Sequence, residues 1–460
     1  MKLGLLREGT TLDVRLHGML APIEAEIRKR AGLEALLPIL EGAKHSIFEC
    51  LREGLHSSVA AQAVTLKILN LCLAKYHFLA RSSTVLSRPF GLIIDPSNAC
   101  NLACPGCVHS TRVKELQLFS WGKGLLPEGR LNSFLANYGP YAIHANFCNY
   151  GEPLINSDTP RYIRQAKRQL VKTMLSTSLS LGRFDAEAYA ESGLDYMLVS
   201  IDGATQAVYE RFRRNGRIEQ ACENIRKLAE AKRKLGRRTP VIAWRFLTFE
   251  HNVHEIPAAI ERARELGADQ FLTLAPYDVR WDDPEIVPAE IEPVNLLFDT
   301  KPEAAIHANW NAFPDDLDSE TIGAEFERSW SDRPVVAENH ANGGSTCHWL
   351  YKSITMDANG RIIPCCAAPR PDIDLHFADF DAASQADVFN SEKYRLARLS
   401  FADADRYRQE AGHLERDPYC VRCDWNKETP NAGADTIVQY FKHAGTEVFN
   451  RESLAILSSW

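Results

Sequence analysis

Three closely spaced cysteines are the residues of this chain whose pattern most clearly predicts chemistry. Cys100, Cys104 and Cys107 follow a C-x3-C-x2-C spacing. Three thiolates so close can hold three irons of a [4Fe–4S] cluster, whose complete cysteine ligation takes four. The fourth iron then has no local cysteine, and a metal site that does chemistry keeps such an open position. The alternative is a zinc knuckle, for which His109 is the nearest further ligand.

A second group of cysteines lies nearer the C-terminus. Cys347 is followed eighteen residues later by Cys365, and Cys420 and Cys423 form a C-x2-C pair. Four protein thiolates close the coordination of a cluster, which suits electron transfer better than ligation of a substrate. The alternative is a four-cysteine zinc site that only holds this region together. Cys366 is a spare or alternate ligand.

Residues 88–276 contain the elements that would position the first cysteine group. Apolar, strand-like runs alternate there with helical patterns such as Ile218–Leu235 and Ile256–Leu266. Six such units predict an α/β fold with a parallel sheet, whose functional residues lie at the carboxyl ends of the strands. The expected strands are Phe90–Ile94, Tyr141–Phe147, Val171–Thr177, Tyr196–Ile201, Val241–Leu247 and Gln270–Ala275.

The rest of the chain divides into four further regions. Residues 1–87 show apolar residues at helical spacing, which predicts a packing or dimerisation cap, or alternatively a substrate lid or docking module. Residues 277–345 are rich in Asp, Glu and Pro and are expected to form an irregular bridge. Residues 346–430 hold the second cysteine group, and residues 431–460 are expected to form a short terminal helix.

Composition limits the partners and the compartment. The 460 residues are enough for two or three domains, and the net charge of −7 without a basic tract argues against a nucleic-acid partner. The most apolar stretch, Val59–Ala80, contains two lysines, so no membrane span is expected. The N-terminus becomes charged too early for a signal peptide. Twelve cysteines, clustered at short spacings, favour metal ligation in a reducing, cytoplasmic compartment.

The run from Asn98 to Cys107 resembles the signature of the radical S-adenosylmethionine (radical SAM) superfamily, which has this spacing in the loop after its first barrel strand. The resemblance implies an open, partial (β/α)6 barrel over residues 88–276. It also implies that the unique iron chelates SAM, and that one electron splits SAM into methionine and a 5′-deoxyadenosyl radical. The family usually has an aromatic residue just before the third cysteine, where this chain has Gly106.

Motifs at the ends of later strands resemble the SAM contacts of the same family. Gly151-Glu152-Pro153 matches the Gly-Glu-Pro motif, whose glutamate lies near the SAM amino group. An ammonium in a poorly solvated pocket needs such an acceptor. The third expected strand ends like the Ser-Thr-Asn motif of the family, with Ser178 in place of the usual asparagine. The fourth ends like the Ser-Ile-Asp-Gly motif. Alternatively, Ser200 and Asp202 at the end of the fourth strand cap the next helix. The further implied contacts are Ser176, Thr177, Ser200 and Asp202.

Two strands carry polar residues where buried parallel strands are normally apolar. Arg245 is expected to bind the SAM carboxylate or an acidic substrate group, or alternatively to form a structural ion pair, for instance with Asp202. His144, Asn146 and Cys148 alternate with apolar residues, and we expect the polar set to face the inside of the barrel. Some epimerases of the superfamily use a cysteine to donate a hydrogen atom, which makes Cys148 a catalytic candidate. The alternative is an ordinary buried cysteine.

The segment from Gly360 to Cys365 matches the Gly-x4-Cys element of the SPASM and twitch extensions, which bind auxiliary clusters in one branch of the family. Full SPASM domains have seven cysteines for two clusters, and this chain has fewer at suitable spacing. The resemblance therefore implies a SPASM/twitch-like domain with one auxiliary [4Fe–4S] cluster on Cys347, Cys365, Cys420 and Cys423. It also implies an electron donor such as flavodoxin or ferredoxin.

Three functions are compatible with these motifs. The main expectation is a radical SAM oxidoreductase, a dehydrogenase or related dehydratase, acting on a small polyol or amino sugar. The first alternative is a maturase that modifies a ribosomally made peptide. The second alternative is a non-catalytic scaffold held together by metal.

Overall fold

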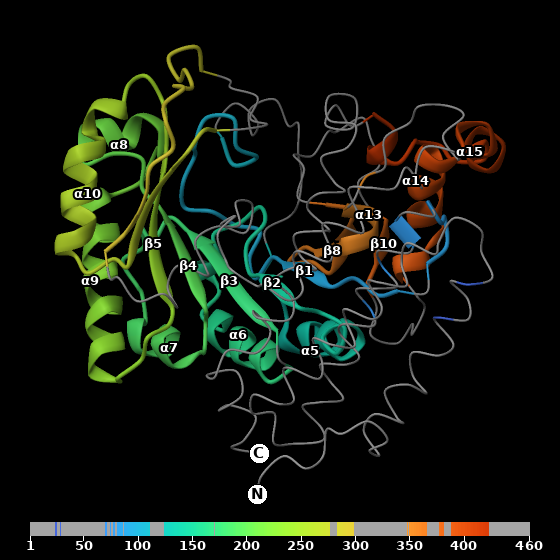
Figure 1. Ribbon diagram of the computed structural model, residues 1–460, viewed down its shortest axis with the longest axis horizontal. Coiled ribbons are helices and arrows are strands. Elements are labelled where there is room, and N and C mark those ends of the chain that lie inside the picture. The colour runs from blue at the N-terminus through green and yellow to red at the C-terminus, as the bar shows by residue number, and fades with distance from the viewer. Residues whose placement is uncertain are drawn as a thin grey trace, which may run out of the picture.

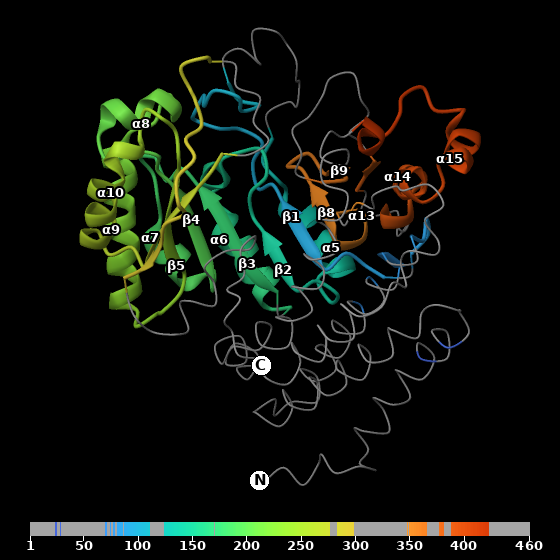
Figure 2. The ribbon, with the colours of Figure 1, turned by 45° about the horizontal axis from the view of Figure 1, so that its top comes forward.

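A single ten-stranded sheet forms the centre of the protein, with helices packed along its outer side (Figures 1 and 2). The computed structural model describes residues 24, 28, 70, 74, 77–78, 81–85, 87–110, 124–169, 171–276, 283–298, 347, 349–365, 377–380 and 388–422. Most of the expected N-terminal helical region, most of the acidic bridge and the whole expected terminal helix lie outside these residues.

Six parallel strands make up the middle of the sheet, in the order in which they occur along the chain. This confirms the parallel sheet expected from the alternation of strand and helix patterns. The sheet does not close into a full barrel, since its order runs from β10 at one edge to β7 (Asn295–Leu297) at the other. The six strands are β1 (Gly91–Ile94), β2 (His144–Asn146), β3 (Lys172–Thr177), β4 (Tyr196–Ser200), β5 (Val241–Leu247) and β6 (Gln270–Leu274).

The C-terminal region continues the same sheet at the β1 edge. Strand β8 (Ser353–Met356) pairs in parallel with β1, and β9 (Arg361–Ile363) and β10 (Ala378–Asp379) follow in antiparallel order. Backbone hydrogen bonds therefore join the two regions that each carry a cysteine group. This continuity was not expected from the sequence, because strand pairing across more than 250 residues leaves no local pattern.

Helices between the strands cover the outer face of the sheet. Strand residues such as Leu92, Leu175 and Trp244 pack there with apolar helix residues in the main core. The helix with the clearest apolar face repeats Ile218, Ala221, Ile225 and Leu228 at intervals of three and four. The helices are α5 (Glu128–Tyr138), α6 (Thr159–Lys167), α7 (Ala186–Glu191), α8 (Gln206–Phe212), α9 (Ile218–Lys234) and α10 (Ile256–Glu265).

The remaining helices lie mostly in the C-terminal region. Helix α13 (Trp349–Lys352) leads into β8, and α14 (Glu392–Ala402) and α15 (Ala404–Ala411) pack against each other. Short 3₁₀ turns occur at Pro153–Ile155, Val253–Glu255, Val388–Asn390 and Tyr419–Arg422. Within the described part of the chain, no helix combines the length and the apolar character that crossing a membrane would require.

Candidate active site

The three closely spaced cysteines lie in a compact loop directly after β1. The Cys107 amide donates to Cys104 O at 3.1 Å, and the Ser110 amide donates to Cys107 O at 2.8 Å, so the loop turns at each of these cysteines. The Leu102 amide donates to Cys100 Sγ at 3.4 Å, a contact of the kind that tunes cluster sulfurs. Burial raises the pKa of Cys104 to about 11, so metal binding at this thiol must displace its proton.

His109, the nearest further ligand for a zinc knuckle, has a hydrogen bond to the backbone. His109 Nε2 lies 2.7 Å from the carbonyl oxygen of Tyr150, so this ring joins the cysteine loop to the loop after β2. Among the residues described, no three His, Cys, Asp or Glu side chains group around a position for one metal ion. Zinc needs its ligands around a single ion, whereas a cubane spreads its cysteines over separate irons. Three cysteines alone can hold three irons of a cluster, whereas a zinc site would need a fourth ligand besides them.

Apolar side chains from distant segments surround the cysteine loop. Leu102 and Cys104 pack with Phe212 after β4, Phe249 after β5 and Ile286 before β7. The rings of Phe212 and Phe249 have centroids 4.6 Å apart. Such a shell excludes water and lowers the local dielectric, which strengthens every charge interaction with a group bound there.

Three polar atoms around the loop are buried and lack a hydrogen-bond partner among the described residues. They are Asn101 Oδ1, Asn149 Nδ2 and Arg213 Nη2. Buried polar groups in folded proteins are nearly always satisfied, so each of these atoms needs a further partner. The two donors and one acceptor fit a polar, charged group in this place, as a cluster with bound SAM would be.

Asp95, at the end of β1, holds the Gly-Glu-Pro loop in position. Its buried carboxylate accepts from the backbone amides of Asn149, Tyr150 and Gly151 at 3.0–3.3 Å. Burial raises its pKa to about 7 against the effect of these amides. Gly151 must be glycine, since a Cβ there would meet the carbonyl of Ser97 at 1.6 Å. Sequence reasoning missed Asp95, although a carboxylate that ends an apolar strand before a cysteine loop was a usable signal.

Glu152 is buried and receives hydrogen bonds from the end of β3. Thr177 Oγ1 donates at 2.5 Å, and the amide and hydroxyl of Ser178 each donate at 2.8 Å. Burial raises the pKa of Glu152 in spite of these donors. The structure thus brings together Glu152, Thr177 and Ser178, the last of which the motif comparison had set aside. In this arrangement Thr177 and Ser178 orient the glutamate.

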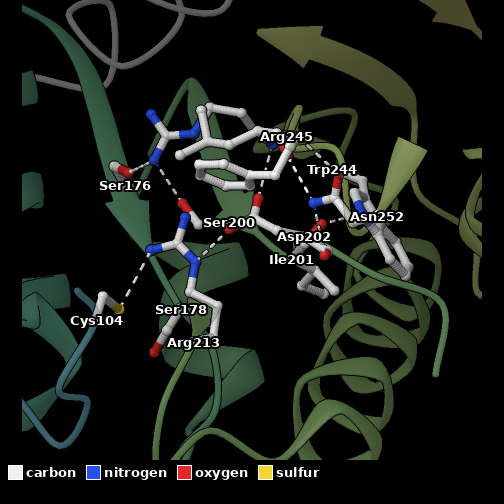
Figure 3. Close-up of polar contacts among 12 residues, drawn as sticks. Cys104, Ser176, Ser178, Ser200, Ile201, Asp202, Arg213, Trp244, Arg245 and Asn252 are labelled. Carbon is white, nitrogen blue, oxygen red and sulfur yellow. Dashed lines mark hydrogen bonds and ion pairs between the residues drawn. The ribbon is translucent and has the colours of Figure 1, made fainter. Parts of the chain in front are cut away.

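Arg245 on β5 contacts two of the expected site serines, Ser200 on the adjacent strand β4 and Ser176 on the next strand, β3 (Figure 3). Its Nη2 donates to Ser176 Oγ at 3.0 Å and to Ser200 Oγ at 2.5 Å. The suggested ion pair with Asp202 is not formed: the Asp202 carboxylate pairs with Arg213 instead, at 2.6 Å. The suggested capping role is also wrong for Asp202, because Thr205 Oγ1 accepts from an amide in the first turn of α8.

Arg213 is a site residue that sequence reasoning missed. It follows α8, donates through Nε to Asp202, and places Nη1 3.9 Å from Cys104 Sγ (Figure 3). Three arginines occur between positions 211 and 214, and no sequence pattern distinguishes the one that turns inward. Only the tertiary structure selects it, by placing Arg213 between Asp202 and Cys104.

The polar set of β2 faces the inside of the barrel, as expected. The alternating residues Ile143, Ala145 and Phe147 belong to the main core on the outer side. Cys148 Sγ lies 3.9 Å from Gly151 O, beside the Gly-Glu-Pro loop. Burial, with the nearby Asp95 and Glu152 charges, raises the pKa of Cys148 well above its usual value. This thiol therefore stays protonated, as a hydrogen-atom donor must be.

The three described cysteines of the second group lie near a buried core of aromatic residues and one arginine. Arg398 on α14 is fully buried and donates to the carbonyl oxygens of Leu350, Phe389 and Ser83 and to Asn390 Oδ1. Its guanidinium lies within 5.5 Å of the ring centroids of three aromatic residues, which are Tyr351, Phe389 and Tyr394. These contacts join α13, α14 and the segment before β1.

Three of the four expected auxiliary ligands lie among the described residues. Cys347 precedes α13, Cys365 follows β9, and Cys420 is in the last 3₁₀ turn. Cys365 and Cys420 both act electrostatically on Tyr394, whose pKa is raised mainly by burial. Gly360 forms the β8–β9 turn with φ +83°, which favours glycine, and so places β9 and Cys365. Cys423 and Cys366 lie outside the described residues.

Two protein-family models match the chain. Residues 94–243 match the model described as radical SAM superfamily, and residues 347–424 match the one described as SPASM, an iron–sulfur cluster-binding domain. These two ranges contain both cysteine groups. They confirm the expected cofactors, which are SAM and iron–sulfur clusters in both regions. The expected class of fold, a partial radical SAM barrel with a C-terminal SPASM-type region, is also confirmed.

Two curated proteins are similar to this chain over part of its length. The chain is 25% identical over 295 residues to "PqqA peptide cyclase" from Gluconobacter oxydans. This alignment covers 62% of this chain and 72% of the relative. It is 27% identical over 210 residues to "Probable GTP 3′,8-cyclase" from Methanococcus maripaludis. That alignment covers 45% of this chain and 66% of the relative. The chain thus spans about two thirds to three quarters of the length of these relatives.

Among solved structures, Streptococcus suis SuiB bound to S-adenosylmethionine is 13% identical with a TM-score of 0.42, and covers 85% of this chain and 82% of SuiB. The cysteine loop, the open parallel sheet and the two family matches agree with one another. The chain belongs to the radical SAM superfamily, in the branch with a C-terminal SPASM iron–sulfur cluster-binding domain.

Proposed function

We propose that this radical SAM enzyme modifies a peptide substrate. The supporting relative is the peptide cyclase, whose alignment of 295 residues is too long to be contained in the barrel region alone. This favours the maturase alternative over the small polyol or amino-sugar substrate that was the main expectation. The scaffold alternative has no support, because the family is one of enzymes.

Each part of the site has a role in this proposal. Cys100, Cys104 and Cys107 hold the first cluster, and the Gly-Glu-Pro loop binds the amino group of SAM through Glu152. When bound, the cluster would supply the electron for the reductive cleavage of SAM. Thr177 and Ser178 hold the Glu152 carboxylate in one orientation. The apolar shell excludes water, which would otherwise quench reactive species.

The inner face of the sheet carries the observation that best supports a polar, peptide-like substrate. Asn146 Oδ1, Ser353 Oγ and Thr355 Oγ1 are buried and have no hydrogen-bond partner among the described residues. Thr355 and Asn146 lie in register on either side of Ile93, so strands β8, β1 and β2 present them in one row. A peptide carries donors and acceptors at every residue and can satisfy such a row.

Arg245 and Cys148 complete the proposed substrate side of the site. Arg245 is held by two serine hydroxyls and offers a guanidinium to a carboxylate of SAM or of the peptide. Cys148 is positioned to return a hydrogen atom to a peptide radical if the reaction is an epimerisation. The auxiliary cluster, held by Cys347, Cys365, Cys420 and Cys423, supplies an electron acceptor when bound, which suits a net oxidation such as crosslinking.

The electron donor belongs to this proposal as well. A small redox protein such as flavodoxin or ferredoxin would supply the low-potential electron, which places the enzyme in a reducing compartment, the cytoplasm. The N-terminal region would serve as a dimerisation cap, or as a docking module for the precursor peptide.

The experiment is anaerobic incubation of the reduced enzyme with SAM and candidate precursor peptides. Transfer of deuterium from a labelled peptide into 5′-deoxyadenosine supports the proposal and identifies the reacting position. One SAM consumed per crosslinked product, with loss of two hydrogens, supports net oxidation. Deuterium transfer from a sugar or cyclitol, with none from any peptide, would overturn the peptide proposal and restore the small-molecule expectation.

A further inference from the structure

The ion pair between Arg213 and Asp202 lies directly beside the cysteine loop (Figure 3). Arg213 Nε and Asp202 Oδ2 are 2.6 Å apart, and the two side chains are 13% and 0% exposed. Arg213 Nη1 is 3.9 Å from Cys104 Sγ. The cation is therefore the member of the pair that contacts a cluster ligand.

The pair is held rigidly from several sides. Asp202 Oδ1 accepts from the Leu247 amide at 2.7 Å, and Asn252 Nδ2 donates to the Asp202 carbonyl at 3.1 Å. The guanidinium carbon of Arg213 lies 5.0 Å from the ring centroid of Phe212. Burial acts to lower the pKa of Arg213, but the Asp202 carboxylate raises it above its ordinary value, so the guanidinium stays a cation.

One donor of Arg213 is still available. Nη2 is buried and has no hydrogen-bond acceptor among the described residues. Nη1 of the same guanidinium already contacts a cluster ligand, so an acceptor supplied by the bound group is the simplest way to satisfy Nη2. A sulfide of the cluster, or an oxygen of a molecule bound to it, has the required chemistry.

We propose that Arg213 is a positioning residue that sets the reduction potential of the SAM-binding cluster, with Asp202 acting in the opposite direction. Adding one electron increases the negative charge of a thiolate-bound cluster. A buried cation next to a ligand sulfur stabilises that reduced state, and a nearby carboxylate destabilises it. This inference goes beyond the proposed function and does not depend on the peptide.

A purely structural role for the pair is less consistent with its surroundings. The loop after β4 already has its own anchor, since Glu255 accepts from the amides of Ala204 and Thr205 and from Thr205 Oγ1. The ion pair adds little to the placement of this loop. What it adds is a charge at Cys104.

The test is a redox titration of the anaerobically reconstituted holoenzyme without SAM, followed by electron paramagnetic resonance. A Cys365→Ala background removes the signal of the auxiliary cluster. Arg213→Gln is expected to lower the ratio of reduced to oxidised cluster about tenfold at a fixed potential, which is about 59 mV for a one-electron couple. Asp202→Asn is expected to raise this ratio, and Arg213→Lys is expected to restore part of the loss.

A matched control is the buried ion pair of Lys167 and Asp195, 2.7 Å apart and 4% and 5% exposed. Asp195 precedes β4, whereas Asp202 follows it, so the control pair lies at the opposite end of the same strand. Lys167→Gln and Asp195→Asn should weaken stability and leave the potential unchanged.

Shifts of the same sign in the Arg213 and Asp202 variants would overturn the proposal, as would an unchanged potential at full iron content. If Arg213→Gln fails to assemble a cluster, Asp202→Asn and Arg213→Lys decide the question. An Asp202→Asn enzyme that is no easier to reduce than the wild type rejects the idea. Failure of every candidate peptide would leave this result unaffected.

Discussion

The two cysteine regions of this protein are built in different ways. In the first, three cysteines lie within eight residues, the buried Asp95 carboxylate holds the loop after β2, and the Asp202–Arg213 ion pair lies beside Cys104. In the second, the described cysteines are separated by tens of residues and lie near a core of aromatic rings and one buried cation, Arg398. The first region combines an apolar shell with unsatisfied polar atoms beside the cysteines, whereas in the second the buried Arg398 guanidinium has hydrogen-bond acceptors for all three of its nitrogen atoms.

The difference indicates that the two regions have different functions. Unpartnered buried donors and acceptors near the first loop point to a bound polar group whose state changes during reaction. In the second region, Arg398 donates to four neutral acceptors and joins three segments, so its contacts maintain the fold around the cysteines. The first region is therefore expected to govern chemistry, and the second to govern stability and electron transfer.

The largest expected effect separates the two regions by iron content and SAM cleavage. With both clusters, the enzyme should hold about eight irons. Cys104→Ala should lose about half of them and abolish formation of 5′-deoxyadenosine. Cys365→Ala should also lose about half, yet still cleave SAM without forming product. Iron assays and chromatography of the nucleoside measure both.

Cys222→Ala serves as the control for these variants, because Cys222 is a buried cysteine in α9 within the main core. It should change neither iron content nor SAM cleavage. SAM cleavage by Cys104→Ala would remove the first loop from the mechanism.

The second effect concerns Arg398. Arg398→Met should destabilise the protein by about 3–5 kcal/mol, because several buried carbonyl groups lose their donor. Chemical denaturation under anaerobic conditions measures the free energy of unfolding. Arg395→Met on the same helix is the control: Arg395 is 40% exposed and pairs with Glu410 at 3.4 Å, so a change below about 1 kcal/mol is expected. Equal effects of the two variants would refute a core role for Arg398.

The third effect tests the first region through SAM affinity. Glu152→Gln removes the charge that three strong donors surround, and should weaken SAM binding about tenfold or more. Equilibrium binding to the oxidised holoenzyme measures it. Glu219→Gln is a control at an exposed glutamate on α9, which pairs with Arg262. Unchanged affinity in Glu152→Gln would exclude the glutamate from the SAM site.

The last effect, which is spread over several pH units, is the pH dependence of the free energy of unfolding due to Asp95. Its pKa of about 7 lies above the ordinary value of 3.8, so the folded state holds a proton that the unfolded state has released. This contribution is complete below about pH 4 and is lost as the pH rises to about 7. Between pH 5.5 and 7 the loss is about 1.6 kcal/mol, because Asp95 is already half ionised at pH 7. Asp95→Asn should lack this slope in anaerobic denaturation experiments, and an identical slope in both proteins would contradict the assignment.

The sequence predicted the barrel elements closely because their signals are local. Each of the six parallel strands falls within the range expected from apolar runs, and α9 and α10 match the expected helices to within one residue. The Gly-Glu-Pro motif and the polar residues on β2 and β5 were also recognisable one strand at a time. The side-chain partners were less predictable: Arg245 pairs with Ser176 and Ser200, and Asp202 pairs with Arg213.

The sequence alone determined the cysteine spacing, the order of the strands and the families of cofactor, since each of these follows from residues near one another in the chain. Only the tertiary structure decided that β8 extends the barrel sheet at β1, that Asp95 anchors the Gly-Glu-Pro loop, and that Arg213 reaches Cys104. These contacts join segments 50 to more than 250 residues apart. Packing selects such pairs among many residues of the same type, and no local periodicity records that selection.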